Sequence, residues 1–162
     1  MTRTSKIALT STILATTALV LPQAAWADGT PECNNGSALQ STECGSHSST
    51  TAIYTTAVGF LSKAEAIGSV ATGRSSTAKG EKSVASGYLA SAFGAHSIAI
   101  GSETDAMADN TTVLGYSSYA TADRGSALGS YAKVSGVGGT AVGSSSLAGA
   151  EDSTALGRES RA

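Results

Sequence analysis

One unit of 14 residues is written eight times between Ile53 and Ala162, with no insertion or deletion, although the last copy stops two residues short. A glycine marks every copy at the same spacing: Gly59, Gly73, Gly87, Gly101, Gly115, Gly129, Gly143 and Gly157. A fixed short period without gaps is typical of solenoids, in which each copy forms one coil and contacts its neighbours. Residues 53–162 are therefore expected to form one elongated domain.

The unit is too short for a helical repeat and suits two short strands joined by two tight turns. Counting from Ile53 as position one, position five is alanine except at Val113, and position twelve is alanine except at Val134. Successive side chains on a strand point to opposite faces. Positions five, ten and twelve, filled by Ala, Ser and Thr, are thus expected to line a narrow interior. Positions seven and fourteen, rich in glycine, are expected where the chain turns.

Positions four and six carry no charged residue and flank the interior position five, so they are expected to point outward as an apolar ladder. Such a stripe on a monomer would be an exposed apolar patch along the whole rod. Aromatic residues make up 5% of the chain, so the interior of one solenoid is thin. The pattern therefore predicts that the ladder is buried against other copies of the chain. Its largest members are Val70, Val84, Ile98, Ile100, Leu114, Leu128, Val142 and Leu156.

Positions eleven and thirteen are mixed and partly charged, which predicts that they face water. Because these positions vary from copy to copy, they are the candidate ligand-contact surface. Its members are Lys63, Lys79, Phe93, Asp105, Met107, Tyr119 and Lys133.

Three runs within the repeat carry a family resemblance: SVATG (69–73), SVASG (83–87) and SIAIG (97–101), with related runs following at the same spacing. They resemble the YadA-like head repeats of trimeric autotransporter adhesins, over about 110 of the 162 residues. The resemblance implies an all-β, left-handed parallel β-roll of about eight coils, three of which wind around one axis. It also implies a virulence-associated adhesin on the outer membrane of a Gram-negative bacterium, with collagen, another matrix protein or a second cell surface as partner.

The first 27 residues are expected to be a signal peptide. Arg3 and Lys6 form a basic start, an apolar stretch follows, and Ala25 and Ala27 fit the small-residue rule for cleavage. No other apolar run approaches the roughly 20 residues of a membrane-spanning helix. The net charge of −2 becomes more negative once these two basic residues are removed, which argues against a nucleic-acid partner.

Residues 28–52 are polar and contain both cysteines, Cys33 and Cys44, with ten residues between them. In an exported protein this pair is expected to form a disulfide, which would contribute about 2–3 kcal/mol by closing a small loop. A metal or redox pair is the alternative, but His47 is the one nearby ligand type and no CxxC motif is present. The segment is expected to act as a cap on the first coil.

The sequence stops inside an unfinished coil, and no heptad run accompanies the repeat. In the family a neck, a coiled-coil stalk and a membrane anchor follow the head. The chain is thus interpreted either as a fragment, which the abrupt stop favours, or as a secreted head without its own anchor.

No motif predicts an enzyme, a cofactor or a metal site. The stretches 76–79 and 130–133 match SxxK but lack the companion boxes of penicillin-binding enzymes. Two function classes remain. One is an adhesin head whose outer surface contacts host matrix or cells, and the other is a passive structural spacer or secreted filament component without its own ligand.

Overall fold

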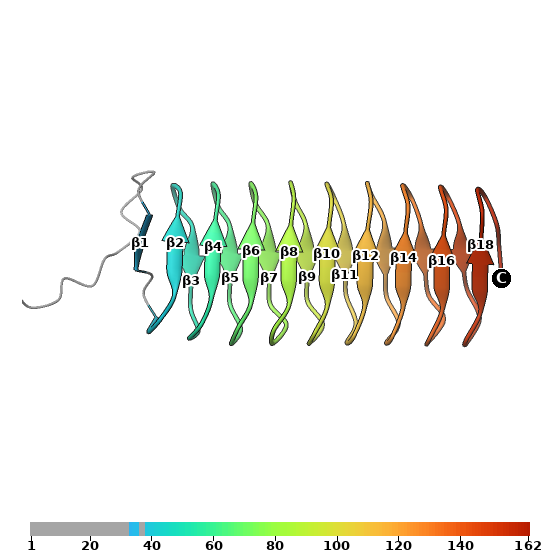
Figure 1. Ribbon diagram of the computed structural model, residues 1–162, viewed down its shortest axis with the longest axis horizontal. Coiled ribbons are helices and arrows are strands. Elements are labelled where there is room, and N and C mark those ends of the chain that lie inside the picture. Colours follow the sequence, from blue (N-terminus) through green and yellow to red (C-terminus); the bar gives the residue numbers. More distant parts are fainter. Residues whose placement is uncertain (1–32, 36–37) are drawn as a thin grey trace, which may run out of the picture.

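The computed structural model describes residues 33–35 and 38–162, so the predicted signal peptide (residues 1–27) lies outside the described residues. The described chain is a solenoid in which short strands stack side by side along one long axis (Figure 1). The predicted parallel β-solenoid is confirmed.

Each coil contributes one strand to each of two sheets. The strands of the first sheet occupy positions four to six, preceded by one extra strand: β1 (Cys33–Asn35), β2 (Thr42–Cys44), β4 (Thr56–Val58), β6 (Val70–Thr72), β8 (Val84–Ser86), β10 (Ile98–Ile100), β12 (Thr112–Leu114), β14 (Ser126–Leu128), β16 (Thr140–Val142) and β18 (Thr154–Leu156). The strands of the second sheet occupy positions eleven and twelve: β3 (Ser49–Thr50), β5 (Lys63–Ala64), β7 (Thr77–Ala78), β9 (Ser91–Ala92), β11 (Asp105–Ala106), β13 (Tyr119–Ala120), β15 (Lys133–Val134) and β17 (Leu147–Ala148).

The register between strands is the 14-residue period itself. Ala99 on β10 pairs with Ala85 on β8 and with Val113 on β12, and every parallel pair in both sheets keeps this offset. Like therefore stacks on like along the solenoid. A slip of one residue would turn the interior face of a strand outward, which is why the register is so strongly specified.

The interior is a single layer of small side chains between the two sheets. The alanines of positions five and twelve are fully or almost fully buried, except Ala162 in the last coil, and the largest buried apolar side chains are Val113 and Val134. Position ten is buried as predicted. Position three, which the pattern does not assign to the interior, is buried as well, with members such as Ser69 and Thr111.

Most buried hydroxyls at positions three and ten are satisfied by the turn that precedes them. The hydroxyls of Ser62 and Ser76 each donate to the carbonyl of the position-seven glycine three residues earlier, at 3.0 Å. Thr111 does the same with the carbonyl of Ala108 at 2.8 Å. A buried hydroxyl without a partner is destabilising, so this local bond explains why Ser and Thr can replace Ala in so narrow an interior.

Two sharp bends per coil pass through residues with left-handed backbone conformation, at positions two and nine. Lys82 and Leu89 are one such pair, with φ of 53° and 55°. Of the residues at these positions, Gly68 and Gly138 alone are glycines, both with φ of 70°. The pattern predicts the turns from the glycines of positions seven and fourteen, and it misses these bends.

The glycines of position seven follow the first-sheet strand, and their φ values are also positive. At Gly101, with φ of +133°, an added Cβ would lie 2.0 Å from the carbonyl oxygen of Gly115 in the next coil. Glycine is therefore required there twice, for its conformation and for the close approach of two backbones.

A further coil precedes the eight that the period indicates. Residues 39–52 form β2 and β3, on which Glu43 pairs with Ala57 and Thr50 with Ala64. The pattern assigns this stretch to the polar N-terminal segment because Glu43 and Thr50 stand where other coils have alanine. The Glu43 carboxylate is buried, and its Oε1 accepts hydrogen bonds from the backbone N–H and the hydroxyl of Thr50, at 2.6 and 2.7 Å.

The N-terminal edge of the first sheet is covered by β1, which runs antiparallel to β2. Cys33 lies opposite Cys44 in this pairing, and the two are joined by a disulfide with a Cα–Cα distance of 4.1 Å. The unpaired backbone groups of an edge strand can pair with another chain. Here β1 pairs with β2 and itself becomes the short N-terminal edge of the sheet.

Gly101→Ala is expected to destabilise the solenoid by more than the about 1–3 kcal/mol of an unfavourable backbone conformation, because the new Cβ also collides with the next coil. Gly149→Ala is the matched control, since its Cβ would meet nothing nearer than the Ala162 carbonyl oxygen at 3.6 Å. Urea unfolding followed by circular dichroism measures both variants. An unchanged midpoint for Gly101→Ala would contradict the stacking argument.

Ser76→Ala is expected to lower the free energy of unfolding by about 0.5–1.5 kcal/mol, because a buried hydrogen bond is lost. Ser97 is equally buried, but its hydroxyl has no hydrogen-bond partner. Ser97→Ala is therefore expected to leave stability unchanged or to raise it. The same unfolding experiment compares the two variants. An equal loss of unfolding free energy in both would disprove that the hydrogen bond from the Ser76 hydroxyl to the Gly73 carbonyl stabilises the interior.

Candidate functional site

The solenoid presents two outward faces and two rows of turns. The two faces and the turns at positions eight and nine each carry a different class of side chain. We use the name apolar ladder for eight outward side chains of the first sheet, the same eight that the sequence predicts. The outer face is the outward side of the second sheet, positions eleven and thirteen. The turn ridge is formed by positions eight and nine.

The apolar ladder consists of two rows that meet at one strand. At position four Val70, Val84 and Ile98 pair in succession on β6, β8 and β10. At position six a second row begins on β10, and it continues to the C-terminal end of the sheet as Ile100, Leu114, Leu128, Val142 and Leu156. The apolar stripe thus crosses the sheet obliquely.

Small hydroxyl residues occupy most of the outward positions that the stripe leaves free, with Val58 at position six of β4 as an apolar exception. At position six of β6 and β8, Thr72 donates a hydrogen bond to Ser86 at 2.9 Å. The ladder itself is partly open to solvent, with exposed fractions of 42% at Ile100 and 67% at Leu156. An outward row of branched aliphatic side chains is the kind of surface that is normally covered by another protein surface.

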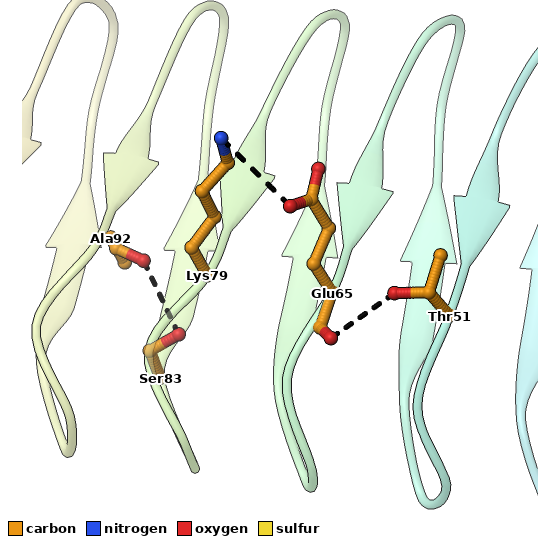
Figure 2. A network of polar contacts seen from close by, with 5 residues as sticks. All are labelled: Thr51, Glu65, Lys79, Ser83 and Ala92. Atoms are coloured by element: carbon orange, nitrogen blue, oxygen red, sulfur yellow. Dashed lines mark hydrogen bonds and ion pairs between the residues drawn. The ribbon is translucent and has the colours of Figure 1, made fainter.

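On the outer face, residues at position thirteen form a continuous chain of contacts through neighbouring coils. The Thr51 hydroxyl donates to the backbone carbonyl of Glu65 at 3.1 Å, and the Glu65 carboxylate pairs with Lys79 at 3.8 Å (Figure 2). Figure 2 also shows the Ser83 hydroxyl donating to the Ala92 carbonyl inside the coil, at 3.4 Å. The Lys79 ammonium lies 5.3 Å from the centre of the Phe93 ring, one coil further.

Further along the outer face, position eleven carries a second pair of this kind. The Lys133 ammonium lies 5.2 Å from the centre of the Tyr119 ring. Such cation–π contacts at exposed sites contribute about 0.5–1 kcal/mol and hold the long side chains against the sheet. The structure therefore brings the predicted surface residues Lys79 with Phe93 and Tyr119 with Lys133 into contact. Lys63, Asp105 and Met107 lie on the same face.

The turn ridge carries an aromatic row that sequence reasoning misses. Arg74 lies between two rings, with its guanidinium 6.0 Å from the centre of Phe60 and 5.5 Å from the centre of Tyr88. Tyr116 and Tyr131 meet edge to face at 5.4 Å. The signal is present in the sequence as an aromatic residue at position eight or nine in four of the coils, but it is hidden because two different positions share it.

One group on the ridge has a shifted titration. The Glu103 carboxylate, and after it the neighbouring Tyr131, raise the pKa of the Tyr116 phenol above its ordinary value of 10.0. The phenol is therefore neutral at physiological pH and acts on the ridge as a hydrogen-bonding group and an apolar ring.

Residues 33–35 and 38–162 contain no group of three or more His, Cys, Asp and Glu side chains able to hold a metal ion. Within the same residues, no helix is long and apolar enough to cross a membrane.

Comparison with known proteins identifies the repeat. The family model described as "YadA head domain repeat (2 copies)" matches residues 51–76, 78–104, 108–132 and 135–160. Among solved structures, the collagen-binding domain of the Yersinia adhesin YadA is similar, with 32% sequence identity and a TM-score of 0.48 over 70% of this chain. The match covers 54% of that domain, so the chain spans about half of its length. No curated protein sequence matches the chain.

Proposed function

Because the chain belongs to the YadA head domain repeat family, we propose that it is the head module of a trimeric autotransporter adhesin, displayed on a bacterial cell surface. The observation that carries this proposal is the family match over four blocks of the solenoid. YadA heads are adhesins rather than enzymes. The two unlike faces of the solenoid support the proposal, since an adhesin head needs one surface for assembly and another for its ligand.

The apolar ladder is the proposed assembly surface, facing the axis of a homotrimer. The interior of one solenoid contains little apolar volume, and its largest buried apolar side chains are valines. Fully burying a Leu or Ile side chain stabilises by about 1.5–3 kcal/mol. Covering the ladder with two further copies would thus supply burial that a single chain lacks. The oblique course of the stripe predicts that contacts pass from position four to position six along the rod.

Replacing Leu114 and Leu128 with aspartate is expected to convert the trimer to single chains, because like charges would meet in an apolar contact. Two aspartates on the other sheet, Thr77→Asp and Ser91→Asp, provide a control with the same added charge. Light scattering after size-exclusion chromatography measures the mass in solution. A single-chain mass for the unsubstituted protein, or a three-chain mass for the ladder variant, would disprove this assignment.

The outer face is the proposed ligand surface. Its residues vary between coils, they combine both charges with aromatic and aliphatic side chains, and trimer formation through the ladder leaves them accessible. Mixed surfaces of this kind suit extracellular matrix proteins, where charge complementarity sets specificity and the rate of association. Collagen is the first ligand to test, because the similar Yersinia domain is a collagen-binding domain.

Reversing three charges on the outer face, with Lys63→Glu, Lys79→Glu and Asp105→Lys, is expected to weaken binding to immobilised collagen by about tenfold or more. Lys82→Glu, Arg124→Glu and Asp152→Lys make a matched control, since they carry the same charge changes at position two, outside the outer face. Surface plasmon resonance measures both triple variants.

Equal binding by the two triple variants would move the ligand site away from the outer face. If the unsubstituted trimer binds neither collagen nor other immobilised matrix proteins nor host cells, the passive spacer or filament component becomes the correct reading.

A further inference from the structure

A hollow of about 340 Å³ lies on the second sheet near the C-terminal end of the solenoid. Its lining consists of Tyr131, Lys133, Ser145, Leu147 and Arg161. Leu147 pairs with Lys133 on one side and forms a bridge with Arg161 on the other. The apolar side chain of Leu147 therefore lies between two cationic residues on neighbouring coils. Tyr131 and Ser145 stand two positions earlier, on the turn that leads into each strand.

Within the described chain neither cation of the hollow pairs with a carboxylate, although the Lys133 ammonium also lies 5.2 Å from the centre of the Tyr119 ring. In the described part of the chain the ion pairs are Lys79–Glu65, Lys82–Glu81 and Arg158–Glu159, and neither Lys133 nor Arg161 takes part in one. Glu159 follows Tyr131 and Ser145 at position nine of the next coil. Its carboxylate lies 3.0 Å from the Arg158 guanidinium, with which it forms an ion pair.

In a chain of net charge −2, two unpaired cations around one hollow favour an anionic ligand. A planar guanidinium such as that of Arg161 suits carboxylate and sulfate oxygens in particular, because it can donate two parallel hydrogen bonds.

The remaining lining is suited to a ring that is apolar on one side and rich in hydroxyls. The Tyr131 ring is fixed by its edge-to-face contact with Tyr116, with an interplanar angle of 89°. It offers a flat apolar surface beside Leu147, and its phenol and the Ser145 hydroxyl can each donate and accept a hydrogen bond. The volume lies at the small end of the range for ligand pockets, about 300–1,000 Å³, which admits one or two sugar rings.

We propose that this hollow binds an acidic sugar, a sugar ring that carries a carboxylate or a sulfate. Arg161 and Lys133 hold the acid group, and Tyr131 and Leu147 contact the apolar side of the ring. The inference rests on the proposed adhesin function and names a ligand class for the C-terminal end of the solenoid, where the outer face adjoins the turn ridge. The five residues come from three coils and from two positions of the repeat, so one copy of the unit cannot make the site.

The test titrates the full chain with three probes by isothermal calorimetry: sialyllactose, which carries a carboxylate, a sulfated heparin disaccharide, and neutral lactose. Binding of one or both acidic sugars, without binding of lactose, is the expected result, and the probe that binds shows which acid group the site takes. Lys133→Gln with Arg161→Gln is expected to weaken that binding by about tenfold or more, because charged hydrogen bonds are lost. Lys82→Gln with Arg124→Gln removes the same charge at position two, outside the outer face, and is expected to leave sugar binding unchanged.

Absence of binding of both acidic sugars to the unsubstituted chain would overturn the proposal, and so would equal weakening in the two double variants. Circular dichroism shows that each variant is folded, so a loss of binding is not a loss of structure. Collagen binding, measured on the same samples, separates this inference from the proposed function. If collagen binds while neither sugar does, the sugar site is wrong and the adhesin proposal stands.

Discussion

Backbone contact between neighbouring coils is the constraint on which the whole solenoid depends. At position seven each glycine N–H donates to the position-six carbonyl of the coil before it, as from Gly73 to Val58 at 2.7 Å and from Gly87 to Thr72 at 2.8 Å. Because the glycines also approach one another without room for a Cβ, every coil has to place this turn at the same height and angle. An inserted residue would break these contacts in two coils at once. This accounts for a period without gaps.

The same close spacing forces large side chains to the outside. Two sheets joined by such short turns leave space for Ala, Ser, Thr and an occasional valine, so residues such as Leu114, Tyr131 and Phe93 cannot enter the interior. In most globular domains the large apolar side chains form the core, whereas here they lie on the surfaces. Fold and recognition are thereby separated: inward positions maintain the solenoid, and outward positions are free to specify what binds to it.

The sequence predicts the elements of this fold that depend on side-chain size. Alanine at positions five and twelve identifies the interior, and the period identifies the register. The left-handed bends at positions two and nine escape prediction because no single residue type marks them. Lys82, Leu89 and Ser75 have similar positive φ values but chemically unrelated side chains. The first coil escapes because Glu43 stands in the alanine position, where Thr50 satisfies its carboxylate. Gly45, which lies 14 residues before Gly59, is the signal that would have revealed it.

The proposed sugar site could not be found from the sequence for a different reason. Aligning the copies compares each position with itself, whereas the site combines Tyr131 at position nine of one copy with Leu147 and Arg161 at position eleven of the next two copies. Adjacent strands are about 4.7–4.9 Å apart, so position eleven of alternate coils brings side chains 28 residues apart in the chain to within about 10 Å. Any site on such a surface therefore consists of departures from the repeat that happen to be neighbours across coils. For a solenoid, the unit identifies the fold, and the differences between successive units determine the ligand.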